Sequence, residues 1–218
     1  MTYGKHTLTL RSVNRLAAVA ELRESDVDPD PLKQFRRWYA DADGAEIRAP
    51  QAMALATATP DGAPSVRMVL LKSADERGFV FFTGYVSRKA CELDANPHAA
   101  LLFHWEPLGR QVRVEGHVER VAEQESDAYF STRPRGAQLA AAASHQSSVL
   151  RDRAEIDSRV AELAREHEGS DVRRPDHWGG YRLVPETYEF WQHRDDRMHD
   201  RLRYRRDNGD WVVERLSP

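Results

Sequence analysis

The segment from Gln111 to Val121 constrains the fold most strongly, because apolar and polar residues alternate along it. Val112, Val114 and Val118 fall on one face of this segment, and charged side chains stand between them. A period of two with one polar face is typical of a half-buried strand in an antiparallel sheet. We therefore expect a sheet that covers a core with one face and meets solvent with the other.

Other segments have the composition of strands and are bounded by turn signals such as Pro60-Asp61-Gly62 and Asp207-Asn208-Gly209. Strands are expected at 52–59, 65–72, 78–83, 99–105, 181–184, 187–192, 202–206 and 211–216. Helical spacing and start signals predict helices at 13–22, from 31 into the polar run 41–46, and at 87–95, 123–132, 136–144 and 151–168. Strands joined by hairpin turns, with helices around them, predict an α+β protein built on an antiparallel barrel.

The composition fits one soluble globular protein. A chain of 218 residues is long enough to bury a core, and we expect one domain at 29–218 after a partly mobile segment at 1–28. The net charge of −3 argues against broad binding to nucleic acid, which needs a basic surface. The sequence contains neither a membrane span nor a secretory apolar core, and Cys91 is its one cysteine. We therefore expect a cytoplasmic protein without disulfides or membrane contact.

Several familiar sites are absent from the sequence. It has no phosphate-loop motif, no glycine-rich dinucleotide fingerprint and no cysteine pair. Its nine histidines form no HExxH motif and no pair with an obvious third ligand, so we expect no metal site.

The stretch from Arg67 to Lys89 is the first candidate site. Two apolar runs, Met68–Leu71 and Phe79–Phe82, flank a polar SADERG, which predicts a hairpin that leads into a helix capped by Ser87. A helix N-terminus carries unpaired N–H groups and a partial positive charge, and it therefore suits a phosphate. The alternative is a hairpin whose charges simply face water. The cationic side chains at the edges of these elements are Arg67, Lys72, Arg88 and Lys89.

Further polar and aromatic candidates follow along the chain. Tyr129 and Arg133 are four residues apart and share a helix face, and the Gln146-Ser147-Ser148 run can donate to a phosphate or a ring. Gln111 opens a strand and Trp191 ends one. Core packing is the ordinary role of such aromatic residues, and it remains the alternative for Tyr129 and Trp191.

Arg197, His199 and Arg201 alternate, so in an extended stretch all three side chains would point the same way. Such a face requires an anion, because like charges cannot be buried unpaired. The alternative is pairing with the interleaved acids Asp195, Asp196 and Asp200, and for His199 a surface position.

Ordered motifs give the chain a specific resemblance from about residue 29 to its C-terminus. They are DPLKQFRRW, RMVLLK, GFVFFTG, SRKACELDANP, ALLFHW, GRQVRVEG, YFSTRPRGAQ, HQSS, HWGGYR, EFWQ, RMHDRLRY and ERLSP. The chain resembles the pyridoxamine/pyridoxine 5'-phosphate oxidase family. The resemblance implies an FMN-binding split barrel and a homodimer that builds each site from both subunits.

The resemblance also implies roles for matching residues. Arg67, Arg88 and Lys89 would hold the FMN phosphate, and Arg197 and His199 would be catalytic, lying over the substrate ring. Lys72, Tyr129 and Arg133 would bind the substrate phosphate. The full set expected around FMN is Arg67, Met68, Val69, Leu70, Leu71, Lys72, Phe82, Thr83, Arg88, Lys89, Gln111, Gln146, Ser147, Trp191 and Arg201.

The activity implied is FMN-dependent oxidation of pyridoxamine and pyridoxine 5'-phosphates to pyridoxal 5'-phosphate, with O2 as acceptor. Two alternatives stay open: a related FMN-dependent oxidase of secondary metabolism, of the phenazine-pathway type, and a non-catalytic flavin- or pyridoxal-phosphate-binding protein. The sequence departs from the family at Asn14–Ala17 and His193-Arg194, and at Ala137, where a serine commonly helps to hold the substrate phosphate. Ala140 and Ala142 also replace a usual glycine and tryptophan.

Overall fold

A computed structural model describes residues 21–218 of the chain. The helix expected at 13–22 and the divergent positions Asn14–Ala17 therefore lie outside the described residues, except for residues 21–22, which are not helical. There Leu22 is buried, and its backbone N–H donates to the Asp200 carboxylate at 3.1 Å.

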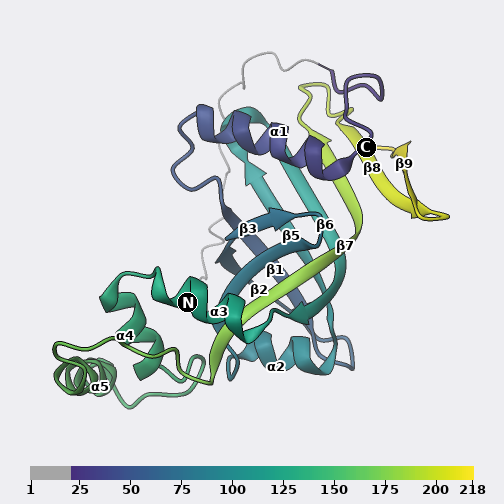
Figure 1. Cartoon of the computed structure of the whole chain (residues 1–218). Helices are drawn as coiled ribbons and strands as arrows, with labels where there is room; N and C mark the ends of the chain where they lie inside the picture. Colours follow the sequence, from purple (N-terminus) through teal and green to yellow (C-terminus); the bar gives the residue numbers. More distant parts are fainter. Residues whose placement is uncertain (1–20) are drawn as a thin grey trace, which may run out of the picture.

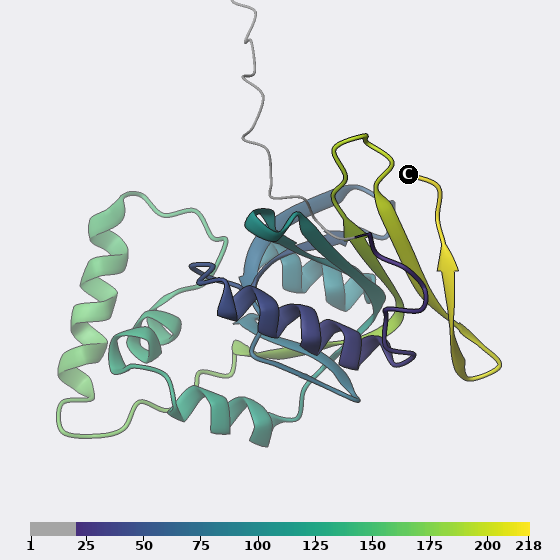
Figure 2. The same ribbon diagram turned by 90° about the horizontal axis from the view of Figure 1, so that it is seen from above.

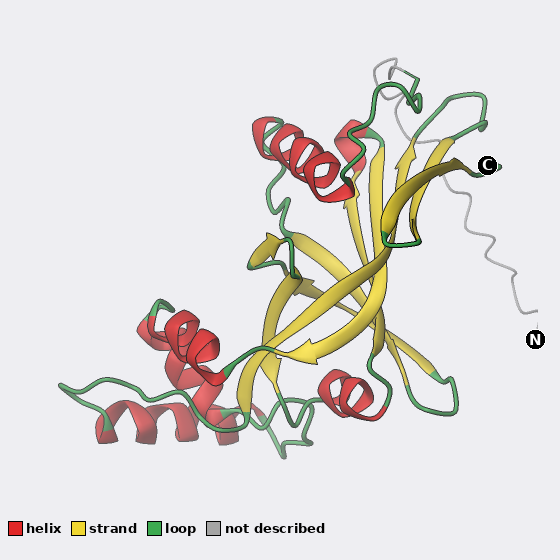
Figure 3. Cartoon of the chain, turned by 45° about the vertical axis from the view of Figure 1, so that its right-hand side comes forward, coloured by secondary structure: helices red, strands yellow, loops and turns green. Residues whose placement is uncertain are grey.

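Within the described residues, nine antiparallel strands form one curled sheet (Figures 1 and 3). The strands run in the order β2-β1-β5-β6-β7-β4-β3, and β8 and β9 extend from β7. The expected α+β architecture with an antiparallel barrel is confirmed. The strand bounds are β1 Ala52–Ala58, β2 Pro64–Leu70, β3 Ser73–Asp75, β4 Gly78–Gly84, β5 His98–Trp105, β6 Arg110–Arg120, β7 Trp178–Gln192, β8 Asp200–Asp207 and β9 Asp210–Arg215.

Helices cover the barrel in separate places. Helix α1 lies along one side of the sheet, while α3, α4 and α5 gather beside it as a separate group (Figure 2). The helices are α1 Pro31–Gly44, α2 Arg88–Ala95, α3 Glu123–Ser131, α4 Arg135–Ala143 and α5 Arg153–Glu166, with a 3-10 turn η1 at Glu106–Leu108. These bounds confirm the helices predicted from residue 31 onward to within about two residues at each end.

Sequence signals explain the start of α1 and the burial of β6. The Asp30 carboxylate accepts hydrogen bonds from the backbone of Leu32 and Lys33, and Pro31 occupies the first helical position. In β6 the residues Val112 and Val114 are fully buried, as the alternation predicts. The core beneath is aromatic: the Phe35 ring lies 4.9 Å from Phe79 and 5.0 Å from Phe103.

The hairpin expected between Met68–Leu71 and Phe79–Phe82 is wrong. Strand β2 pairs with β1, and β4 pairs with the short β3. The backbone changes its hydrogen-bonding partner between two consecutive residues. The Leu71 N–H donates to Gln51 O at 2.9 Å, whereas the Lys72 N–H donates to Val80 O at 2.8 Å. Strands β2 and β3 stand at opposite ends of the strand order, so this change of partner brings both ends of the sheet together.

The strands expected at 181–184 and 187–192 form one strand, β7. The pairing of β6 with β7 shifts between Glu115 and Gly116, where Pro185 is the partner of Gly116. A proline has no N–H to donate, and a bulge accommodates it without breaking the strand. Gly116 is required there, since a Cβ would lie 2.0 Å from the Val184 carbonyl oxygen.

Candidate active site

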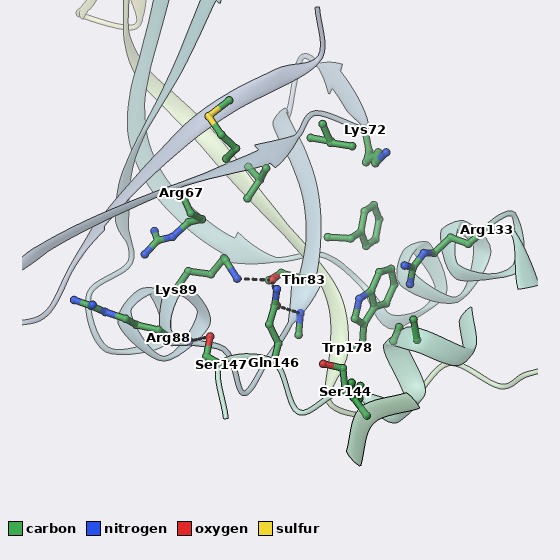
Figure 4. Close-up of a pocket in the computed structure, with 18 of the residues that line it drawn as sticks. Arg67, Lys72, Thr83, Arg88, Lys89, Arg133, Ser144, Gln146, Ser147 and Trp178 are labelled. Carbon is green, nitrogen blue, oxygen red and sulfur yellow. Dashed lines mark hydrogen bonds between the residues drawn. The ribbon is translucent and has the colours of Figure 1, made fainter. Parts of the chain in front are cut away.

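A cavity of about 990 Å³ opens between β2, β4 and the helices α2 to α5 (Figure 4). Arg67, Arg88 and Lys89 lie toward one side of it, and Lys72 and Arg133 toward the other (Figure 4). The structure thus brings two groups of cations to one cavity. The predicted site residues that line it are Arg67, Met68, Val69, Leu70, Lys72, Phe82, Thr83, Arg88, Lys89, Tyr129, Arg133, Gln146 and Ser147.

The first cationic group is organised around the buried carboxylate of Glu92, whose side chain is only 4% exposed. Glu92 Oε1 accepts from Arg88 Nε at 2.8 Å, and Oε2 accepts from Arg67 Nη2 at 3.4 Å. The hydroxyls of Thr57 and Ser65 each donate to Oε2 at 2.5 Å. Burial alone would raise the pKa of Glu92, but these hydrogen bonds outweigh it and lower the pKa to about 2.

Arg67 is fixed on four of its five N–H groups. Nη1 donates to Leu55 O at 3.1 Å and to Thr57 Oγ1 at 2.6 Å, and Nη2 donates to the Ser65 hydroxyl and to Glu92. The guanidinium is therefore held rigidly at the cavity wall. Arg88 uses only Nε for Glu92, and its side chain is 63% exposed toward the cavity mouth.

Lys89 is the buried cation of this group. Its Nζ donates to Thr83 Oγ1 at 3.0 Å (Figure 4) and to Ser87 Oγ at 3.1 Å, and the residue is 7% exposed. The Ser87 side chain accepts this bond and makes no hydrogen bond to the helix backbone, so the expected side-chain cap of α2 is not formed. Burial, reinforced by the Arg67 charge, lowers the pKa of Lys89 to about 8, and Glu92 opposes this effect.

The charges of this group match a phosphate. Three cations, Arg67, Arg88 and Lys89, and one carboxylate, Glu92, leave a net charge of +2. A phosphate monoester carries about −1.5 to −2 at neutral pH. These residues therefore fit the phosphate of a cofactor such as FMN, beside the N-terminus of α2.

The loop after α4 is hydrogen-bonded to the same wall of the cavity. Gln146 Oε1 accepts from Thr83 Oγ1 at 2.8 Å and from Gly84 N at 3.1 Å (Figure 4). Ser147 Oγ accepts from the Arg88 backbone N–H at 3.2 Å, which satisfies one of the free donors at the start of α2. The predicted residues Gln146 and Ser147 are thus held beside the cationic group.

The second cationic group lies on an aromatic stack. The Phe82 ring is parallel to Tyr129 at 4.1 Å and to Trp178 at 5.4 Å, and Lys72 Nζ lies 5.6 Å from the Tyr129 ring centre. The Arg133 guanidinium lies 4.6 Å from the Trp178 ring centre. Arg133 Nη1 is the one buried side-chain nitrogen or oxygen of the described residues that lacks a hydrogen-bond partner. An anion bound here would supply the missing acceptor.

The remaining predicted residues do not line this cavity. Leu71 faces a neighbouring space with Phe35 and Tyr39. Gln111 pairs with Trp191, and Trp191 pairs with Arg201, where β6, β7 and β8 run side by side. The His199 ring lies 4.6 Å from the Trp191 ring, so these residues form a second cluster.

Arg197, His199 and Arg201 do not form one extended face. Arg197 has a φ of 64° and lies in a bend before β8, so the assumed extended conformation is wrong. Arg201 binds Glu189 through Nε at 2.8 Å and Nη2 at 3.2 Å, and not the neighbouring aspartates. The side chains of Asp195, Asp196 and Asp200 instead contact His193, Arg194 and Arg215.

The surroundings of His199 favour its neutral form and determine which ring nitrogen then carries the proton. Burial, together with the charges of His193 and Arg197, lowers the pKa of His199. Its Nδ1 accepts from the Arg194 backbone N–H at 3.1 Å. The neutral ring therefore carries its proton on Nε2, which can donate to a ligand.

Sequence reasoning missed Glu92, Thr57, Ser65 and Trp178. The four-residue spacing between Arg88 and Glu92 is a signal for their contact. Thr57 and Ser65 are direct partners in the β1–β2 register, which the wrong hairpin concealed. Neither a cluster of three metal-ligating residues nor a helix long and apolar enough to span a membrane occurs at 21–218.

Comparisons with known proteins agree along the whole described chain. The family profile described as Pyridoxamine 5'-phosphate oxidase matches residues 40–165, and the Pyridoxine 5'-phosphate oxidase C-terminal dimerisation region matches residues 178–218. A pyridoxine/pyridoxamine 5'-phosphate oxidase of Rubrobacter xylanophilus is 56% identical over 209 residues, covering 96% of both chains. Pyridoxine/pyridoxamine 5'-phosphate oxidase 1 of Ralstonia nicotianae is 59% identical over 202 residues, 92% of this chain and 95% of the relative.

Solved structures add one similar neighbour. PhzG from Burkholderia lata, crystallised with tetrahydrophenazine-1-carboxylic acid, superposes with a TM-score of 0.87 at 39% identity. The match covers 93% of this chain and 100% of that one. A pyridoxamine 5'-phosphate oxidase-related, FMN-binding protein of Nostoc punctiforme has the same fold, with a TM-score of 0.69 at 16% identity over 88% of this chain and 100% of its own.

Proposed function

The chain belongs to the pyridoxine/pyridoxamine 5'-phosphate oxidase family, and from this membership we propose its reaction. It is an FMN-dependent enzyme of vitamin B6 metabolism that oxidises pyridoxamine 5'-phosphate and pyridoxine 5'-phosphate to pyridoxal 5'-phosphate. O2 accepts the electrons and leaves as H2O2, and the amine substrate also releases ammonia. The observation that carries this proposal is one cavity with cations at both ends, suited to a cofactor phosphate and a substrate phosphate together.

We assign Arg67, Arg88 and Lys89 to the FMN phosphate, with Gln146 and Ser147 beside them. The net charge of +2 and the rigid anchoring of Arg67 support this assignment, because a preset site loses little freedom when a phosphate binds. When bound, FMN supplies the hydride acceptor for the substrate and passes the electrons on to O2. The further residues proposed around it are Met68, Val69, Leu70, Leu71, Lys72, Phe82, Thr83, Gln111, Trp191 and Arg201.

We assign Lys72, Tyr129 and Arg133 to the substrate phosphate. Arg133 supports this most directly, because its buried Nη1 lacks an acceptor within 21–218 and burial lowers its pKa. Two phosphates held at opposite ends of one cavity orient the two rings between them. Ala137 cannot donate a hydrogen bond, so Arg133 and Lys72 provide the charge.

Arg197 and His199 act on the substrate ring from the partner subunit. Both lie in the match to the dimerisation region, together with Trp191 and Arg201, and outside the cavity of their own chain. His199 Nε2–H donates to a polar substituent of the ring, and the Arg197 charge stabilises electron density as the substrate is oxidised. The exposed apolar side chains Val66, Met68 and Leu70 along β2 are consistent with a subunit interface at the cavity.

Hybrid dimers test the shared site. Arg133→Ala and Arg197→Ala subunits carry different tags, are coexpressed, and are purified through both tags. If each site uses Arg133 of one subunit and Arg197 of the other, a hybrid contains one intact site and has about half the wild-type activity. Hybrids as inactive as the parent variants would refute the shared site.

A phenazine-type oxidase is the second candidate, favoured by the similarity to PhzG. The separating assay adds pyridoxamine 5'-phosphate in air to the FMN-loaded enzyme and follows pyridoxal 5'-phosphate absorbance and H2O2. Absence of turnover with full FMN occupancy would overturn the leading proposal. Turnover only of unphosphorylated aromatic substrates would support the second.

We propose a single domain from residue 29 onward, supported by one core that contains Phe35 of α1 and Tyr204 of β8. A cytoplasmic location is supported by Cys91, which is an exposed free thiol.

A further inference from the structure

The substrate-phosphate side of the cavity contains a cation with no ionic partner. No carboxylate of residues 21–218 forms an ion pair with Arg133, and its Nη1 is buried without an acceptor. Instead the guanidinium lies over aromatic rings, 4.6 Å from the Trp178 centre and 5.6 Å from the Phe130 centre. Aromatic faces attract a cation without using its N–H groups, whereas a carboxylate would occupy them and cancel the charge.

Trp178 also orients the other phosphate candidates. Its ring is parallel to Phe82 and Tyr129, with interplanar angles of 11° to both. The Phe130 ring meets it edge-on at 5.3 Å. Phe82 lies against Tyr129, and Lys72 approaches the same tyrosine. The Trp178 indole thus packs against both Arg133 and Tyr129, two of the three residues proposed to bind the substrate phosphate.

The indole is itself fixed by the backbone. Trp178 is the first residue of β7 and pairs with Gly84 of β4. Its carbonyl accepts from Arg174 Nη1 at 2.7 Å, and its N–H donates to Pro175 O at 3.0 Å. The residue is 7% exposed, so it offers the cavity a rigid aromatic wall.

We propose that Trp178 is a positioning residue that selects phosphorylated substrates. It holds the Arg133 guanidinium by its π face and leaves the N–H groups for a phosphate. It does so at the end of the cavity away from Glu92 and Lys89, so it acts on the substrate and not on the cofactor phosphate. The inference rests on the proposed function.

The test compares Trp178→Leu with Trp178→Phe, which keeps an aromatic face. Kinetics with pyridoxine 5'-phosphate and with pyridoxine give the preference for the phosphate. Trp178→Leu should lower kcat/KM for the phosphorylated substrate about tenfold, mainly through KM, and leave pyridoxine within about twofold. Trp178→Phe should keep most of the preference. FMN affinity, measured by quenching of flavin fluorescence, should stay within about twofold in both variants.

A double-mutant cycle with Arg133→Met shows whether Trp178 acts through Arg133. In the Arg133→Met background the added Trp178→Leu change should have almost no effect on the phosphate preference. Equal losses for both substrates, loss of FMN, or an unchanged effect in that background would overturn the inference. If Trp178→Leu does not fold, Trp178→Phe carries the cycle, because its weaker cation–π contact should still lower the preference measurably. Absence of wild-type turnover would overturn the proposed function; turnover with a preference unaffected by Trp178 would overturn this inference alone.

Discussion

Replacing Lys89 by methionine should stabilise the FMN-free protein while weakening cofactor binding. A pKa lowered from 10.5 to about 8 corresponds to about 3 kcal/mol of unfavourable free energy for the charged amine in the folded protein. Methionine has a similar length and carries no charge, so it avoids this cost. It leaves Thr83 Oγ1 and Ser87 Oγ without a donor, at about 1 kcal/mol each. The expected net gain is about 1 kcal/mol at pH 7, or about 2 to 4 °C in Tm.

The gain should depend on pH with a defined sign. Below about pH 8, Lys89 is charged in both the folded and the unfolded wild type, and the full burial cost is present. Between about 8 and 10.5 the unfolded chain binds a proton that the folded protein does not, so wild-type stability rises with pH. The variant lacks this contribution. Its advantage should therefore shrink above pH 8 and reverse near pH 9, where the remaining burial cost falls below the roughly 2 kcal/mol of the lost hydrogen bonds.

The assay is thermal unfolding of FMN-free protein at matched concentrations from pH 7 to 10, with titration of FMN at pH 7. FMN affinity should fall about 10- to 100-fold, because a charge-assisted hydrogen bond to the phosphate is lost. Lys33→Met, at an exposed position of α1, is the matched control and should change neither property. A variant less stable than wild type at pH 7, or a difference independent of pH, would refute the reasoning.

Three further changes probe other parts of the site. Arg133→Met should raise KM for the phosphorylated substrate about 10- to 100-fold and leave the bound-flavin absorbance unchanged; a lost flavin spectrum would contradict its assignment. Arg197→Ala should cut turnover strongly with FMN retained, as measured by steady-state kinetics beside flavin content, and loss of the yellow colour would mean a cofactor role. Met68→Glu places a charge on an apolar β2 face that is 64% exposed at this residue, and it should shift the dimer toward monomer in light scattering. A fully dimeric Met68→Glu protein would place the interface elsewhere.

Local signals in the sequence predicted the local parts of the fold. Asp30 and Pro31 fix the start of α1 through two backbone hydrogen bonds, and the alternation in β6 corresponds to its buried valines. These features depend only on neighbours in the chain. The β2–β4 hairpin failed because partner choice is a property of the closed barrel, where Leu71 and Lys72 bond to different strands. Nothing in the spacing of the two apolar runs records that change of partner.

The cluster that contains Trp191, His199 and Arg201 shows the same limit of local sequence patterns. The alternation of Arg197, His199 and Arg201 suggested one face, but the positive φ of Arg197 turns the backbone before β8 begins. A non-glycine residue in that conformation is held by its surroundings, here by the Arg197 N–H bond to Arg194 O at 3.1 Å. Sequence reasoning chose these residues through resemblance, and the extended conformation that it assumed for them is wrong.

Glu92 explains why the net charge of the group formed by Arg67, Arg88 and Lys89 could not be read from the sequence. Its four-residue spacing from Arg88 is that of an ordinary surface pair, which contributes about 0.3 to 0.5 kcal/mol. In the fold, the β1–β2 register places Thr57 opposite Ser65, and both hydroxyls donate hydrogen bonds to the buried Glu92 carboxylate. A carboxylate there separates two arginines that would otherwise repel each other, and it reduces three positive charges to a net +2. The cationic stretch around Arg67 and Lys89 therefore has the net charge that suits a dianion only because Glu92 lies on the same helix as Arg88 and Lys89.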